Sequence, residues 1–135
     1  MQQVQPEGDG MPAVTLKTSG SAPEVEIVVG HLHRADFEFW LYDQNGENPE
    51  LKFNGKTGDP VPDKKQLDVP AAKLDRRTIF WQAGLVSFIG SGASEPFSVV
   101  VRLLQDGRIV GLDGSAGAAM TRPLFEGRFD ITVVP

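Results

Sequence analysis

Two histidines and a glutamate in the first third of the chain are the residues best suited to metal chemistry. His31 and His33 are the only histidines among the 135 residues, and they stand two positions apart. In a strand, side chains two positions apart project from the same face, so both imidazoles could bind one transition metal ion. Glu38 follows five residues after His33 and could add a carboxylate. The sequence therefore offers one candidate site for a divalent metal, formed by His31, His33 and Glu38.

The pattern His-x-His-x4-Glu in residues 31–38 resembles the first metal-binding motif of the cupins, which are double-sheet jelly rolls. The resemblance covers residues 31–46. It implies a metal-binding protein or metalloenzyme, because in that family two histidines and a glutamate hold the metal together with a later histidine. This chain departs from the pattern: it has no histidine after His33, and the interval from Glu38 to Gly46 is one residue longer than in the family. A site here would lack the family's fourth side-chain ligand.

Residues 37–42, Phe-Glu-Phe-Trp-Leu-Tyr, form the most aromatic segment of the chain. Strand alternation places Trp40 and Tyr42 on one face and the more apolar side chains on the other. Such a pair could stack on sugar rings or cover a protein partner. A tryptophan in a two-sheet protein can equally belong to the core, so both environments stay open for Trp40. We predict ligand-binding roles for Trp40, Tyr42, Asp43 and Asn45.

Acidic and amide side chains also gather in the segments expected to be loops, above all in residues 43–63. Asp43-x-Asn45-x-Glu47 begins like a calcium-binding EF-hand loop. Asn48 occupies the position that requires glycine, and the sequence predicts no flanking helices. Asp and Asn are also ordinary turn residues. A calcium-dependent binding module is thus one alternative, and turn formation is the other explanation for these residues.

Composition limits the classes of function. The net charge of −5 and the pI near 4.9 argue against a nucleic-acid partner. The chain has no cysteine, and it has no apolar run long enough to cross a membrane. The N-terminus shows no signal-peptide pattern, so a soluble cytoplasmic protein is the default expectation; a mature exported chain would look the same. We find no complete set of catalytic residues.

Alternating apolar residues and evenly spaced Gly and Pro predict short strands along the whole chain. Asp106-Gly107, between the apolar runs 97–105 and 108–112, predicts a two-residue hairpin. Residues 43–66 are expected to form a long connection with one short strand at 51–53, and 70–74 and 116–120 are short helix candidates. The prediction is an all-β, antiparallel β-sandwich of eight or nine strands, Ig-like or jelly-roll-like. Residues 1–12 would form a flexible tail, and 13–135 a single domain.

The leading functional hypothesis is a non-catalytic β-sandwich that binds a protein partner or a small ligand or glycan through its loops and sheet edges. It follows from the lack of an assembled nucleophile, acid, base or cofactor motif in the sequence. The rival hypotheses are a small cupin-like metal-binding protein or metalloenzyme that uses His31, His33 and Glu38, and a calcium-dependent binding module. The oligomeric state is not predicted.

Overall fold

The computed structural model describes residues 13–30, 33–58, 63–87, 96–118 and 124–135, and these residues form nine strands and one short 3-10 helix. The elements in chain order are β1 (Ala13–Lys17), β2 (Glu24–Gly30), β3 (His33–Tyr42), β4 (Glu50–Gly58), β5 (Asp63–Gln66), η1 (Ala71–Lys73), β6 (Thr78–Ser87), β7 (Phe97–Gln105), β8 (Arg108–Gly117) and β9 (Leu124–Val134). The described chain is therefore nearly all β, as the sequence predicted. No helix among the described residues is long and apolar enough to span a membrane.

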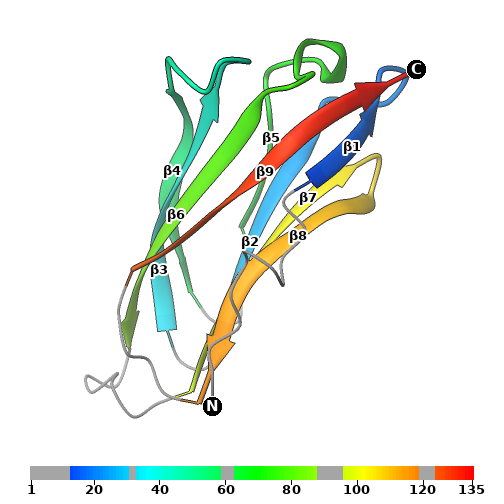
Figure 1. The fold of residues 1–135 in the computed structure, drawn as a ribbon. Coiled ribbons are helices and arrows are strands. Elements are labelled where there is room, and N and C mark those ends of the chain that lie inside the picture. Colours follow the sequence, from blue (N-terminus) through cyan, green and yellow to red (C-terminus); the bar gives the residue numbers. More distant parts are fainter. Residues whose placement is uncertain (1–12, 31–32, 59–62, 88–95, 119–123) are drawn as a thin grey trace.

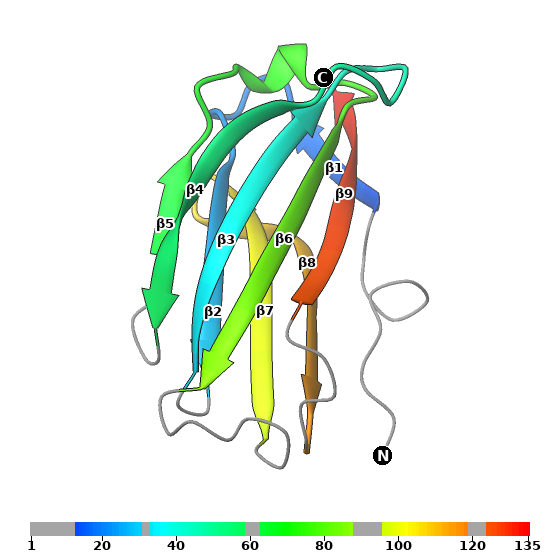
Figure 2. The same ribbon diagram turned by 90° about the vertical axis from the view of Figure 1, so that its left-hand side faces the viewer.

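The strands form two sheets that lie one behind the other (Figures 1 and 2). One sheet has five strands in the order β1-β9-β6-β3-β4, and the other has four in the order β5-β2-β7-β8. All pairs are antiparallel except β1 and β9, which run parallel. The prediction of a purely antiparallel arrangement was wrong at this edge. The two strands come from opposite ends of the chain, so no local turn signal in the sequence could reveal their pairing.

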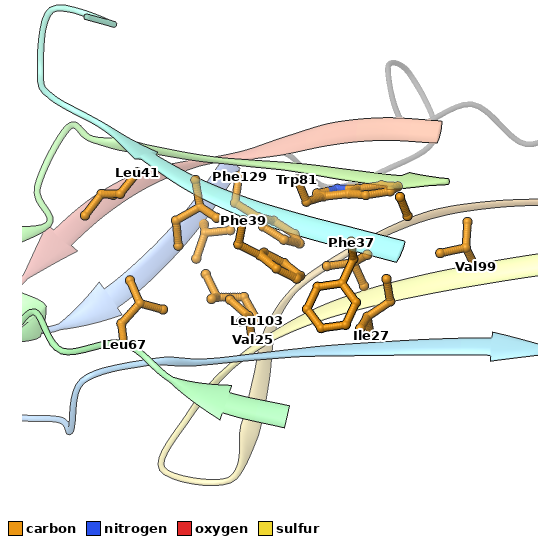
Figure 3. Close-up of a cluster of buried hydrophobic side chains, with 14 of the residues drawn as sticks. Val25, Ile27, Phe37, Phe39, Leu41, Leu67, Trp81, Val99, Leu103 and Phe129 are labelled. Atoms are coloured by element: carbon orange, nitrogen blue, oxygen red, sulfur yellow. The ribbon is translucent and has the colours of Figure 1, made fainter. Parts of the chain in front are cut away.

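In β1, β2, β3, β6, β7 and β9 apolar residues recur at alternate positions, so that each of these strands contributes an apolar face to a shared interior. In β3 the inward residues are Phe37, Phe39 and Leu41, and in β6 they include Trp81, which is 1% exposed. Figure 3 shows these side chains pointing toward Val25 and other aliphatic residues of the four-stranded sheet. One continuous apolar cluster thus receives side chains from both sheets.

The turn between β7 and β8 confirms the hairpin prediction. Gln105 pairs with Arg108, and the two intervening residues both have positive φ, 53° at Asp106 and 79° at Gly107. This combination defines a type I′ turn, whose twist matches that of the strands it joins. Asp-Gly is favoured there because both residues tolerate positive φ.

Two other predictions about local structure were wrong. Residues 43–66 contain two strands, β4 and β5, where the sequence indicated a long loop with a short strand at 51–53. Residues 116–117, part of a proposed helix, belong to the end of β8. In both cases pairing with a neighbouring strand outweighs the weak β-propensity of Gly, Ala, Asn and Lys. The other helix candidate is confirmed as a single turn, η1.

Polar side chains in the interior connect the two sheets. The Gln105 side chain in β7 accepts a hydrogen bond from the Lys17 backbone N–H (2.9 Å) and donates to the backbone oxygens of Lys17 (2.8 Å) and Ser21 (3.1 Å). The indole Nε1–H of Trp81 donates to Oδ2 of Asp113 in β8 at 2.9 Å. Because β1 and β6 belong to the five-stranded sheet and β7 and β8 to the other, these bonds fix how the two sheets face each other.

Candidate functional site

An aromatic patch lies on the outer face of the five-stranded sheet. Trp40 and Tyr42 alternate with buried residues of β3, so they project away from the interior. Trp40 pairs with Phe80 of β6 on one side and with Leu51 of β4 on the other. Directly paired residues share a face, so these four side chains occupy one surface. We define the aromatic patch as Trp40, Tyr42, Leu51 and Phe80.

The rings of this patch are held in place by contacts with one another and with a carboxylate. The rings of Tyr42 and Phe80 meet edge to face, with centroids 6.4 Å apart. The indole Nε1–H of Trp40 donates to Oε1 of Glu38 at 3.3 Å, which directs this edge of the ring along β3 toward Glu38. Trp40, Tyr42 and Phe80 are half-buried, and Leu51 is 42% exposed. The patch is therefore ordered by its own contacts and still open to solvent.

A hollow of about 430 Å³ lies next to the aromatic patch on the same face. We call it the polar hollow because most of its lining residues are polar or charged, although apolar atoms form the larger part of its exposed lining. It is open to solvent, and its volume falls within the usual range for small-molecule sites. Seven of its lining residues come from outward positions of four adjacent strands, and Phe37 and Gly55 also border it. The residues that line the polar hollow are Asp36, Phe37, Glu38, Asn54, Gly55, Lys56, Gln82, Gly84 and Leu124.

Gly84 provides the depth of the polar hollow. It stands in β6 between Asp36 of β3 and Leu124 of β9, and all three occupy outward positions. A Cβ atom at Gly84 would have the Asp36 backbone oxygen, 4.0 Å away, as its nearest neighbour. The space above this glycine is therefore empty, and it is bounded by the side chains of the flanking strands.

The polar groups of the hollow offer both hydrogen-bond donors and acceptors. Gln82 pairs with Glu38, and Glu38 pairs with Asn54, so these three side chains form one row across the sheet. No hydrogen bond joins the side-chain amides of Asn54 or Gln82 to any other described residue. In the next row, Lys56 Nζ lies 3.8 Å from Asp36 Oδ1, a loose ion pair between two exposed side chains. A side-chain amide presents two N–H donors and one acceptor oxygen, so the row with Gln82 and Asn54 can bind a ligand rich in hydroxyl groups.

Asp43 and Asn45, two of the predicted ligand-binding residues, lie in the loop that follows β3, and their predicted role stays a prediction. The Asp43 carboxylate accepts hydrogen bonds from the backbone N–H groups of Asn45 and Glu47 (both 2.9 Å) and from the Asn48 side chain (2.7 Å). The bonds from Glu47 and Asn48 contribute most to lowering the pKa of Asp43 below its usual value. These three bonds close the loop on itself. The calcium-dependent alternative stays a prediction.

The predicted metal ligands are only partly described. His31 lies outside the described residues, and so does the side chain of His33, although its backbone begins β3. Glu38 lies on the outer face and accepts the bond from Trp40. No group of three or more His, Asp or Glu side chains within the described ranges converges in a way that could hold a metal ion. The hypothesis of a site at His31, His33 and Glu38 stays a prediction.

Sequence reasoning placed Trp40 and Tyr42 on one face but missed their cross-strand neighbours. Phe80, Gln82 and Asn54 join the site through strand register, because β4 and β6 flank β3. The alternation of β6, in which Ile79 and Trp81 face inward, would have placed Phe80 and Gln82 on the outer face. The alternation could not have shown which strand lies beside Phe80 and Gln82.

Comparison with protein-family models, curated proteins and solved structures gives no match.

Proposed function

We propose that this protein is a non-catalytic β-sandwich that binds a glycan on the outer face of its five-stranded sheet. The observation that supports this proposal is the aromatic patch next to the polar hollow, on a single sheet face. Stacking on Trp40 and Phe80 would provide apolar contact with the C–H face of a sugar ring. The amides of Asn54 and Gln82 would then hydrogen-bond to its hydroxyl groups.

A glycan fits this surface better than a wholly apolar ligand or a nucleic acid. An apolar ligand would cover the carboxylates and amides of the hollow without satisfying them, and that desolvation opposes binding. A nucleic acid would bring phosphates to a surface with three carboxylates, Asp36, Glu38 and Glu126. Lys56 is the one cation among the described residues that line the hollow, and Arg128 beside Phe80 is ion-paired with Asp130. The binding surface proposed here is a sheet face, whereas the sequence suggested loops and sheet edges.

The proposal can be tested by the replacement of Trp40 with alanine. We expect Trp40→Ala to weaken glycan binding by at least tenfold, since an aromatic anchor at a binding site contributes about 2 kcal/mol or more. The matched control is Ile109→Ala, which removes an apolar side chain that is 56% exposed on the other sheet. Binding would be measured by calorimetry after a screen of immobilised glycans. The proposal fails if Trp40→Ala and Ile109→Ala retain the same affinity, or if the wild-type protein binds no glycan and binds a protein through this face.

A further inference from the structure

We infer that the ligand is an uncharged glycan chain of two or more sugar units that lies along β3, with one ring on the aromatic patch and the next in the polar hollow. This inference rests on the proposed function and specifies its ligand class. It makes two separate claims, one about chain length and one about charge.

The claim about length comes from the placement of two chemically different surfaces in line. The site extends along β3 from Tyr42 to Asp36, a distance of about 20 Å at roughly 3.4 Å per residue. The aromatic patch occupies one end of the site and the polar hollow the other end. They meet where the Trp40 indole donates its hydrogen bond to Glu38. A single sugar ring is too short to cover both surfaces. A chain of linked rings can stack at one end and hydrogen-bond at the other.

The orientation of Trp40 also supports a glycan chain that runs along β3. Its Nε1–H is directed at Glu38, so the indole is fixed along β3. On either side of this axis, Leu51 of β4 and Phe80 of β6 extend the apolar surface around the indole. A ring stacked on this surface would continue along β3, past the side chains of Glu38 and Gln82, into the hollow over Gly84.

The claim about charge comes from the carboxylates of the hollow. Asp36 and Glu38 line it, and Glu126 pairs with Gln82 directly beside it. Among the described residues that line the hollow, Lys56 is the one cation, and it forms a loose ion pair with Asp36 at 3.8 Å. On the same face, Arg128 pairs with Phe80 and forms an ion pair with Asp130 at 3.3 Å. A uronate or a sulfated sugar would meet like charges across a short distance, which opposes its binding. Uncharged sugars present only hydroxyl groups, and the carboxylates and the amides can all hydrogen-bond to these.

Gly84→Val provides a selective test because it fills the hollow and leaves the aromatic patch unchanged. A valine Cβ fits without a close contact at this position, and valine is favoured in strands. The control is Thr132→Val, which introduces the same side chain at an exposed position of β9 outside the site. Urea unfolding would establish that both variants are folded. If Gly84→Val does not fold, the variant Gln82→Ala takes its place in the experiment, because it removes an amide from the same hollow.

The experiment measures the affinity of each protein by calorimetry for gluco-, xylo- and manno-oligosaccharides of one to six units and for a matched galacturonate series. We expect binding by a neutral series to strengthen at least tenfold from the monosaccharide to the trisaccharide. This gain should be lost in Gly84→Val and kept in Thr132→Val. We expect galacturonates to bind at least tenfold more weakly than the preferred neutral series.

The possible failures are distinguishable. A trisaccharide that binds no better than the monosaccharide, or a gain that persists in Gly84→Val, would refute the claim about length. Tighter binding of galacturonates would refute the claim about charge. In each of these cases the loss of binding in Trp40→Ala would still support the proposed function. If no series binds at millimolar concentration, both the proposed function and this inference are wrong.

Discussion

Replacement of Gln105 with methionine tests the hydrogen bonds that connect the two sheets. Gln105 is 7% exposed, and its side chain makes three hydrogen bonds to the backbone of Lys17 and Ser21. Methionine has a similar length and flexibility, so Gln105→Met keeps most of the packing and removes all three bonds. We expect the free energy of unfolding to fall by about 2–3 kcal/mol, on the reasoning that follows.

Each neutral hydrogen bond contributes about 0.5–1.5 kcal/mol net, so three bonds give roughly 1.5–4.5 kcal/mol. The loss should lie in the lower half of this range for two reasons. The Lys17 carbonyl keeps a second bond, from the Gly20 N–H at 3.1 Å. Lys17 is also exposed in an edge strand, so water can replace part of what its N–H group loses.

Urea unfolding monitored by circular dichroism would measure this change. For a chain of this size, a loss of about 2–3 kcal/mol corresponds to a fall in Tm of roughly 6–15 °C. The control is Gln66→Met, the same substitution at an exposed glutamine whose side chain makes one hydrogen bond within the described ranges, to the Ala22 carbonyl at 3.0 Å. A loss below about 0.5 kcal/mol, or no larger than that of the control, would refute the view that Gln105 connects the sheets.

Three further predictions concern the turns and the interior. Gly107→Val should lower the free energy of unfolding by about 1 kcal/mol or more, because its φ of 79° is unfavourable for a β-branched residue; an unchanged urea midpoint would contradict this. Gly127→Ala should lower it by about 1–3 kcal/mol, because the new methyl group would collide with Asp113 and lie 2.7 Å from Trp81 Nε1; a stable variant with both contacts intact in its structure would contradict this. Asp43 has a lowered pKa in the folded state, so its stabilising effect is present above the ordinary value of 3.8 and is lost as the pH falls below it. The urea midpoint of Asp43→Asn should therefore depend less on pH than that of the wild type below pH 3.8, and parallel curves would contradict this.

The sequence predicted the parts of the fold that local signals determine. The turn at Asp106 and Gly107 follows from residue types that tolerate positive φ, and the alternation of 37–42 correctly separates the two faces of β3. β4 was largely missed because Glu50–Gly58 is rich in Gly, Asn and Lys, and its structure depends on pairing with β3. The parallel pair of β1 and β9 is a contact between the two ends of the chain, which no local pattern encodes.

The environment of individual polar residues likewise depends on contacts between strands that are distant in the sequence. Asp113 lies within β8, is 5% exposed, and accepts the hydrogen bond from Trp81, a role that its residue type did not predict. The pattern of β8 concealed this, because its inward positions also include Gly111 and Ser115 in place of aliphatic residues. Gly111 leaves room for the Phe129 ring, since a Cβ there would lie 2.9 Å from its Cδ1 atom. Complementary shapes of this kind can be found only once the facing strands are known.

The most direct test of glycan binding at the outer face uses the two tryptophans of the chain as internal reporters. Trp40 lies half-buried in the proposed site, and Trp81 is buried on the opposite side of the same sheet, bonded to Asp113. Heteronuclear NMR resolves their two indole N–H resonances. During titration with a neutral trisaccharide, we expect the Trp40 resonance to shift, together with the side-chain amide resonances of Asn54 and Gln82, and the Trp81 resonance to stay in place. A bound trisaccharide that leaves Trp40 unchanged, with shifts confined to the loop at 43–48 or to the other sheet, would contradict this account.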